Sequence, residues 1–273
     1  MVTSILAARR GMGPLQRPSP TPSKSERVKA VLEYDGTAYR GWQRQADAPT
    51  VQATCEAALA EVLQGDVAVV AAGRTDTGVH ARGQVVHFDH AARLGAAELQ
   101  RAWNARLPDD IWVASLTPTR PDFHARHDAR ARTYRYRVTM GPRCHSPFVR
   151  RYAWPVAGAM NWSLIEAATG RLLGAHDFRP FAKGAPPTRA GEPPGRCTVV
   201  TARWRNTREG RALEITADRF LRHMVRALAG ALVAIGRGRI GPDEIDRALA
   251  EGGPRPAAGY APPNGLFLWR VTY

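Results

Sequence analysis

Cysteine is scarce in this sequence, with 3 among 273 residues. Cys55, Cys144 and Cys197 stand far apart, without the paired spacing of a disulfide framework or of a cysteine-based zinc site. The pattern therefore indicates neither a disulfide-stapled domain nor a zinc site. A reducing cytoplasm fits it.

Long apolar runs are also lacking. No stretch approaches the ~20 apolar residues that a membrane span needs. The short run at 4–8 is followed by Arg9 and Arg10, so it is too short for a signal peptide and has its charge on the wrong side. We therefore expect neither a membrane span nor a secretion signal.

Patterns typical of metal and cofactor sites are absent or misplaced. His80, His87 and His90 lack the spacing of a helical metal site, so hydrogen-bonding or surface roles are expected for them. Residues 236–241 match a dinucleotide-binding fingerprint letter by letter, but they follow a predicted helix instead of a strand. The sequence therefore indicates neither a metal nor a nucleotide cofactor.

Lysine is nearly absent, although the chain is strongly basic. Lys plus Arg number 39 against 24 Asp plus Glu, a formal charge of +15, and the lysines are only Lys24, Lys29 and Lys183. Arginine forks suit phosphate and stack on bases, so a nucleic acid is the first partner to consider. Abundant Arg, Ala, Gly and Pro would also follow from a GC-rich coding bias, so charge alone leaves the question open.

Residues 1–27 differ in composition from the rest. They mix Gly, Pro, Ser and Thr with five basic residues and one acidic residue, and they show no apolar period. We predict a disordered basic N-terminal arm. The remaining chain keeps a charge of +11, so the basic character belongs to the folded part as well.

The remaining periodicity predicts two α+β halves, 28–142 and 143–273. In the first half we expect strands at 28–34, 67–72, 84–90, 111–116 and 132–140, and helices from Thr50 to Gln64 and at 99–107. In the second we expect helices at 161–173, from about Phe220 and from Pro242, with strands at 198–204, 213–217 and 266–273. The Pro- and Gly-rich stretch 186–195 is expected to be an exposed loop.

A loop at 73–80 joins two predicted strands; its two glycines permit a tight turn, and it presents an acid, Asp76, together with a base, His80. A simple turn is an equally good interpretation of the loop alone, because Asp commonly hydrogen-bonds its own backbone there. The surroundings favour an active site: the protein is Arg-rich, and no metal or phosphate motif lies nearby. Asp76 is therefore the candidate catalytic carboxylate.

The segment 220–226 opens a predicted helix in which Arg219, Arg222 and Arg226 share one face. Such rows are usually solvated. Arg226, however, is followed by the uncharged run 227–235, which places it where the helix enters the core. An arginine at that depth needs a carboxylate partner, because an unpaired buried charge is costly.

Tyr134 lies on the apolar face of its predicted strand, close to Arg126, Arg130, Arg132 and Arg135. Aromatic rings beside arginines are used to stack unstacked bases. A core role is the more usual one for a single tyrosine in such a strand. The pattern by itself does not choose between Tyr134 and Tyr136.

Several blocks in this order resemble the tRNA pseudouridine synthase A family over about residues 28–273. The blocks are 33–36, 41–45, 73–81, 83–88, 122–126, 134–136, 176–178, 220–226 and 265–268. The sequence departs from the family in having Ala227 where Asn is frequent, in its loop at 186–195, and in the extra arm at 1–27.

The resemblance implies an α+β pseudouridine synthase fold: a central antiparallel sheet from two ferredoxin-like halves, flanked by helices, with a basic cleft between them. It implies a homodimer that isomerises uridines 38, 39 and 40 in the anticodon arm of tRNA without a cofactor or metal. The family's catalytic Asp corresponds to Asp76, its neighbouring Arg to Arg74, its base-stacking Tyr to Tyr134, and its Asp-pairing Arg to Arg226.

Two other functions remain to be tested. A catalytically silent tRNA-binding or tRNA-folding protein could share the fold, although binding alone would not require Asp76. A hydrolytic nucleoside or glycoside enzyme would need paired carboxylates, and the second acid that the sequence offers after Asp76 is Asp89, on the following strand.

Overall fold

The computed structural model describes residues 25–91, 94–184, 195–250 and 252–273. Within them, ten strands form one sheet in the order β4-β1-β3-β10-β5-β9-β8-β7, with β2 beside β3 and β6 beside β5. The strands are β1 (Ser25–Tyr34), β2 (Val70–Ala71), β3 (His80–Ala91), β4 (Ile111–Pro118), β5 (Ala131–Thr139), β6 (Trp154–Pro155), β7 (Gly174–Asp177), β8 (Arg196–Thr207), β9 (Gly210–Ala217) and β10 (Leu266–Thr272).

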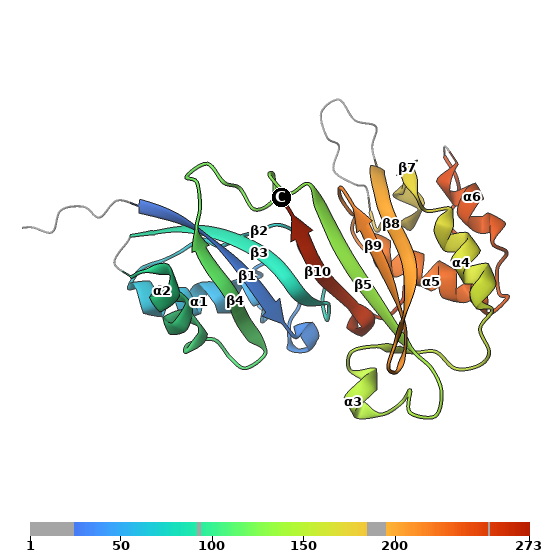
Figure 1. Ribbon diagram of the computed structural model, residues 1–273, viewed down its shortest axis with the longest axis horizontal. Helices are drawn as coiled ribbons and strands as arrows, with labels where there is room; N and C mark the ends of the chain where they lie inside the picture. The colour runs from blue at the N-terminus through green and yellow to red at the C-terminus, as the bar shows by residue number, and fades with distance from the viewer. Residues whose placement is uncertain (1–24, 92–93, 185–194, 251) are drawn as a thin grey trace, which may run out of the picture.

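Helices gather at the two ends of this sheet. Figure 1 shows α1 and α2 beside β1, β3 and β4, and α4, α5 and α6 beside β8 and β9, with β10 and β5 between the two groups. The helices are α1 (Val51–Leu63), α2 (Ala96–Asn104), α3 (Pro147–Arg150), α4 (Trp162–Gly170), α5 (Met224–Gly236) and α6 (Asp243–Leu249), with short 3-10 turns η1 (Gly36–Ala38), η2 (Arg179–Phe181) and η3 (Pro263–Gly265).

The expected α+β class is confirmed, and most of the sheet is antiparallel. Two short pairings are parallel instead: β10 with β3, and β6 with β5. The first of these joins the halves, because β10 lies between β3 and β5. The last strand of the chain therefore connects the N-terminal and C-terminal parts of the sheet.

Two apolar cores flank this junction. One is built on α1, α2 and the strands around β1, and it also takes Leu268 and Val271 from β10. The other is built on α4, α5 and α6, and it takes Tyr136 and Val138 from β5. The cores meet at these two strands: Tyr134 of β5 packs against both cores, and β10 contributes Leu266 to one and Leu268 and Val271 to the other. The halves 28–142 and 143–273 stay a prediction.

Local signals account for several element boundaries. The Thr50 hydroxyl accepts a hydrogen bond from the Ala53 amide at 3.4 Å and begins α1, as expected of a capping threonine. The Asn161 side chain caps α4 in the same way, at 3.1 Å from the Leu164 amide. β1 begins at Ser25, three residues before the predicted strand.

The predicted helix start near Phe220 is wrong. α5 begins at Met224, because His223 has φ of 63° and so cannot continue a right-handed helix. Arg219 and Arg222 therefore lie before the helix and do not share a helical face with Arg226. β7, α3 and β6 were not expected, and β2 covers only two residues of the strand predicted at 67–72.

Some sequence predictions lie outside the described residues. These are the disordered arm, apart from residues 25–27, and nearly all of the loop at 186–195. Among the described residues, no helix is long and apolar enough to cross a membrane. Cys55, Cys144 and Cys197 are all buried.

Candidate active site

Asp76 lies in the loop between β2 and β3, as predicted, and this loop is held by its own backbone and by the segment after η1. The Val79 amide donates to the Asp76 carbonyl at 3.1 Å, and the Trp42 amide donates to the Thr75 carbonyl at 3.0 Å. The Gly78 amide donates to the Tyr39 carbonyl at 3.3 Å. The carboxylate is thus presented from a fixed backbone.

Two glycines allow the segment 36–42 to approach the Asp76 loop closely. A Cβ on Gly36 would lie 2.0 Å from the Val79 carbonyl oxygen, and one on Gly41 would lie 2.7 Å from that of Thr75. Gly41 also has φ of 92°, a backbone conformation that is unfavourable for residues with a side chain. The two loops fit together only because these side chains are absent.

Buried polar side chains hold the same loop from the sheet. The Tyr34 and Thr75 hydroxyls are 2.8 Å apart, and the Gln84 amide nitrogen donates to the Gly73 carbonyl at 2.6 Å. The Nδ1 atom of His80 accepts from the Gly36 amide at 3.0 Å, which agrees with the hydrogen-bonding role predicted for this histidine. Burial lowers the pKa of His80, so the ring is neutral in this role.

The Asp76 carboxylate faces two nitrogen groups from the C-terminal half. Its Oδ2 atom is 3.4 Å from His223 Nε2 and 3.9 Å from an Arg226 guanidinium nitrogen. The side chain of Asp76 is 26% exposed, while those of His223 and Arg226 are 13% and 15% exposed. The carboxylate is therefore accessible to a ligand on one side and supported on the other.

Arg226 occupies the first turn of α5, where the sequence places an arginine entering the core. Its Nε donates to the Ala261 carbonyl at 2.8 Å, and the Ala261 amide donates to the Arg226 carbonyl at 3.0 Å. The carboxylate partner predicted for Arg226 is Asp76, whose Oδ2 atom lies 3.9 Å from the guanidinium. Arg226 is thus anchored mainly by the backbone before β10.

Tyr134 lies on β5 between Leu268 of β10 and Ile215 of β9. Its ring packs edge-on against Phe220, with centroids 5.0 Å apart. Burial, followed by the negative charge of Asp76, raises the pKa of the Tyr134 phenol, so the hydroxyl stays protonated at neutral pH. The structure therefore places Tyr134 close to Asp76 as an uncharged aromatic ring.

Arg74 is two residues before Asp76 in the same loop. Its side chain is exposed, and it makes no hydrogen bond or ion pair with any residue that the structure describes. An exposed guanidinium two residues before Asp76 is free to bind a phosphate.

His223 is the main residue that the sequence predictions missed. The helix was predicted to run through this position, so nothing distinguished His223 from the other residues of the helix. Phe220, the ring against Tyr134, belongs to the same turn before α5. The motif 220–226 contains both residues, but only the backbone turn shows that they approach Asp76 and Tyr134.

The second acid required by a hydrolase is not supplied by Asp89. Both oxygens of Asp89 accept hydrogen bonds at 2.7 Å from Arg27. Asp89 lies nine residues beyond His80 on β3, which corresponds to about 30 Å of extended strand. The structure thus separates this carboxylate from Asp76. No cluster of three or more acidic, His or Cys side chains suited to a metal occurs among the described residues.

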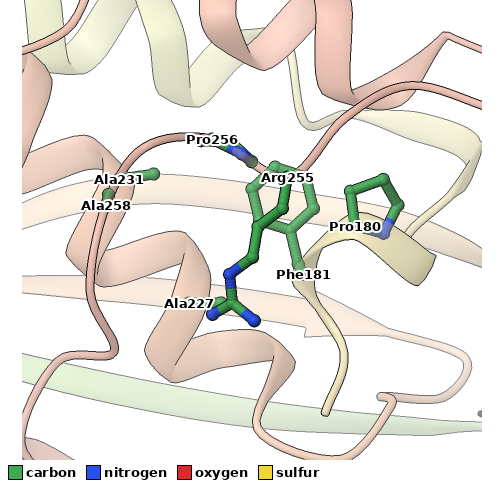
Figure 2. A pocket seen from close by; sticks show the side chains of 7 residues that line it. All are labelled: Pro180, Phe181, Ala227, Ala231, Arg255, Pro256 and Ala258. Carbon is green, nitrogen blue, oxygen red and sulfur yellow. The ribbon is translucent and has the colours of Figure 1, made fainter. Parts of the chain in front are cut away.

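Two pockets have linings that contain none of Asp76, Tyr134 and Arg226. Figure 2 shows a pocket between η2, α5 and residues 255–258, in which the Arg255 side chain extends toward Ala227. Its free volume is about 0 Å³. A second hollow of about 260 Å³ lies at the start of β1 and the end of β3, away from the Asp76 loop. The partly exposed side chain of Asp76 lies outside both pockets.

Comparison with known proteins connects this geometry to one family. The family model described as tRNA pseudouridine synthase matches residues 30–128 and 168–273, which include Asp76 and the turn before α5. Proteins named tRNA pseudouridine synthase A are similar over most of their length. One from Chlorobium phaeobacteroides is 38% identical over 247 residues, 90% of this chain and 93% of its own. One from Moorella thermoacetica is 40% identical over 248 residues, which is 90% of this chain and 99% of its own.

Proposed function

Because this chain belongs to the tRNA pseudouridine synthase family, we propose that it isomerises uridine to pseudouridine in tRNA, with Asp76 as the catalytic carboxylate. The proposal extends to uridines 38, 39 and 40 of the anticodon arm, the sites that the family resemblance implies. The observation that carries it is one partly exposed carboxylate, on a fixed loop, beside an aromatic ring and two nitrogen groups.

The reaction is an exchange of bonds within one nucleotide. The N1–C1′ glycosidic bond breaks, the uracil turns, and a C5–C1′ bond forms. The proton on C5 leaves to solvent and N1 gains one, so atoms and electrons balance without a redox partner. The proposal therefore needs no cofactor or metal.

The target base must first leave its stack, at a cost of a few kcal/mol. Tyr134 lies close to Asp76 and offers a ring on which the flipped uracil stacks. Exposed Arg74 binds a phosphate of the flipped nucleotide. These contacts offset the unstacking and bring the ribose to the carboxylate.

Asp76 then acts on the ribose. Two steps are open to it: attack on C1′, or removal of the C2′ proton. Either step requires an unprotonated carboxylate held in one orientation. Arg226, anchored on Ala261, contributes a positive charge 3.9 Å from Asp76 Oδ2 for this purpose.

The proposed assembly is a cytoplasmic homodimer that shares the tRNA. The family resemblance supports the dimer, and a tRNA substrate supports the location. Light scattering of the purified protein, alone and with tRNA, measures the stoichiometry. A monomer in both conditions would contradict the dimer and leave the proposed chemistry unaffected.

A tritium-release assay tests the reaction and separates it from its rivals. Transcribed tRNA carries tritium at uracil C5, and the pure protein is added without cofactor. We expect tritium in the solvent and no free uracil. Free uracil would indicate a hydrolase. Tight tRNA binding without tritium release would indicate a silent binding protein.

A further inference from the structure

His223 has an unusual backbone for its position. It directly precedes α5 with φ of 63° and ψ of 1°, in the left-handed region that few residues with a side chain adopt. Its side chain does not cap the helix. Such a conformation persists only where surrounding contacts offset its cost, and residues of this kind concentrate at functional sites.

The two ring nitrogens of His223 have different surroundings. Nε2 lies 3.4 Å from Asp76 Oδ2. Nδ1 is buried and has no hydrogen-bond partner among the described residues. A proton on Nδ1 would leave a buried donor unpaired, whereas a proton on Nε2 faces an acceptor. The geometry therefore favours the tautomer with its proton on Nε2.

The charges around the ring favour its neutral form. Burial lowers the pKa of His223; Asp76 opposes this shift, while Arg226, Lys183 and Arg222 reinforce it. The imidazole is therefore uncharged at neutral pH. It can still donate one hydrogen bond to the carboxylate.

Aromatic packing fixes the orientation of the ring. His223 meets Tyr260 edge-on, with centroids 5.1 Å apart and planes at 88°. Tyr260 is held in turn by Arg255, whose guanidinium lies 4.1 Å from the ring centroid and donates to the Tyr260 hydroxyl at 2.7 Å. Figure 2 shows the Arg255 side chain extending toward Ala227, which is in the first turn of α5. Tyr260 packs against the imidazole, and Arg255 in turn holds Tyr260 in place.

We propose that His223 is a positioning residue for Asp76: its Nε2–H group donates a hydrogen bond to Oδ2 and fixes the carboxylate toward the ribose. Arg226 is less able to do this, because its contact is longer and its Nε is used by Ala261. At 3.4 Å the His223 contact is longer than a usual hydrogen bond, and such contacts commonly shorten when substrate binds. This inference rests on the proposed function.

A matched pair of amide variants tests the proposal. In His223→Gln the amide nitrogen can take the place of Nε2, whereas in His223→Asn the amide falls short of Asp76. Asn also tolerates the left-handed backbone well, so the loss in this variant reflects the missing donor. His127→Asn, an exposed histidine elsewhere, serves as the control. Thermal unfolding of each variant measures the folded fraction.

We expect the Asn variant to lower kcat by about 10- to 100-fold, the range for a hydrogen bond to a charged group, with little change in KM for tRNA. The Gln variant recovers most of this loss. Its pH profile keeps the shape of the unmutated protein's above pH 7, because the pKa of His223 is lowered and the ring stays in its neutral, hydrogen-bond-donating form there. The His127 variant keeps full activity.

Several results would overturn the proposal. It fails if the Asn variant is as active as the unmutated protein, or if the Asn and Gln variants lose the same amount of activity. It also fails if only KM changes, or if unfolding of the variant accounts for the loss. A pH profile flattened only in the Gln variant would assign proton transfer to His223 instead of positioning. If the unmutated protein itself forms no pseudouridine, the proposed function fails and this inference fails with it; a loss confined to the His223 variants concerns this inference alone.

Discussion

At the scale of single residues, the site depends on side chains from three distant parts of the chain. Asp76 follows β2, Tyr134 lies on β5, and Arg226 and His223 lie at the start of α5. Each group is held by contacts that do not involve substrate. This arrangement allows the role of each side chain to be tested by a conservative substitution.

Tyr134 is predicted to act through its ring and not through its hydroxyl. Its raised pKa keeps the phenol protonated, which disfavours a role as a base. We expect Tyr134→Leu to lower kcat/KM by about 10- to 100-fold, the value of one base stack, and Tyr134→Phe to lose much less. Single-turnover kinetics measures both. Equal losses in the two variants would show that the hydroxyl itself is required.

Part of this site could be predicted from the sequence. The resemblance identified Asp76, Tyr134 and Arg226, and the uncharged run after Arg226 independently indicated its depth. His223 could not be recognised, because its role depends on a left-handed backbone. The apolar pattern hides that turn: Leu221 and Val225 are both buried, as one helical row would predict, although only Val225 is in α5.

At the scale of elements, the close contact between the segment 36–42 and the Asp76 loop sets the loop's position. Gly36→Ala places a methyl group 2.0 Å from the Val79 carbonyl oxygen. We expect it to lower the free energy of unfolding by about 1–3 kcal/mol, as overpacking does, and to reduce activity by displacing the loop. Urea unfolding and tritium release measure the two effects.

Gly65→Ala is the matched control, because no atom lies within 4 Å of its added Cβ. It should leave both stability and activity close to those of the unmutated protein. If Gly36→Ala and Gly65→Ala lose similar amounts of stability and activity, the close contact at Gly36 does not set the position of the Asp76 loop.

Glu214 on β9 connects three arginines across neighbouring strands. Burial raises its pKa, but hydrogen bonds from Arg203, Arg135 and Arg205 outweigh burial and lower the pKa from 4.5 to about 2. A carboxyl whose pKa is lower in the folded than in the unfolded protein stabilises the fold at pH above the unfolded-state pKa. This stabilisation is lost as the pH falls toward the folded-state pKa. The relevant window therefore lies between about pH 4.5 and pH 2.

The pH dependence of a Glu214→Gln variant tests this linkage. At pH 7 we expect the variant to unfold at lower urea concentration than the unmutated protein. The difference should shrink as pH falls through the window above. Glu166→Gln, which removes an exposed partner of Arg211 alone, should show a smaller difference. A difference for Glu214→Gln that does not change with pH would contradict the argument.

The fold could be predicted element by element more readily than as a whole. Alternation identified β1, β3 and β5, and the Thr50 cap marked the start of α1. The central place of β10 could not be predicted, because its two neighbours are more than a hundred residues away in sequence. Strand pairing at that separation is decided by tertiary packing.

At the scale of the whole molecule, charge is expected to dominate tRNA binding. The formal charge is +15, nearly all of it from arginine. Neutralising phosphates releases counterions, so the affinity should fall about a hundred-fold between 50 and 200 mM salt if four or more phosphates are contacted. Fluorescence titration measures the slope. A Kd independent of salt would contradict a binding surface built on phosphate contacts.

The central claim joins reaction, position and residue, and site-resolved pseudouridine mapping tests all three at once. An unmodified tRNA transcript is incubated without cofactor with the pure protein or with its Asp76→Asn variant, and each uridine is mapped. The account predicts pseudouridine at positions 38 to 40 with the unmutated protein and none above background with the variant. Pseudouridine formed equally by both, or by neither despite tight tRNA binding, would contradict it.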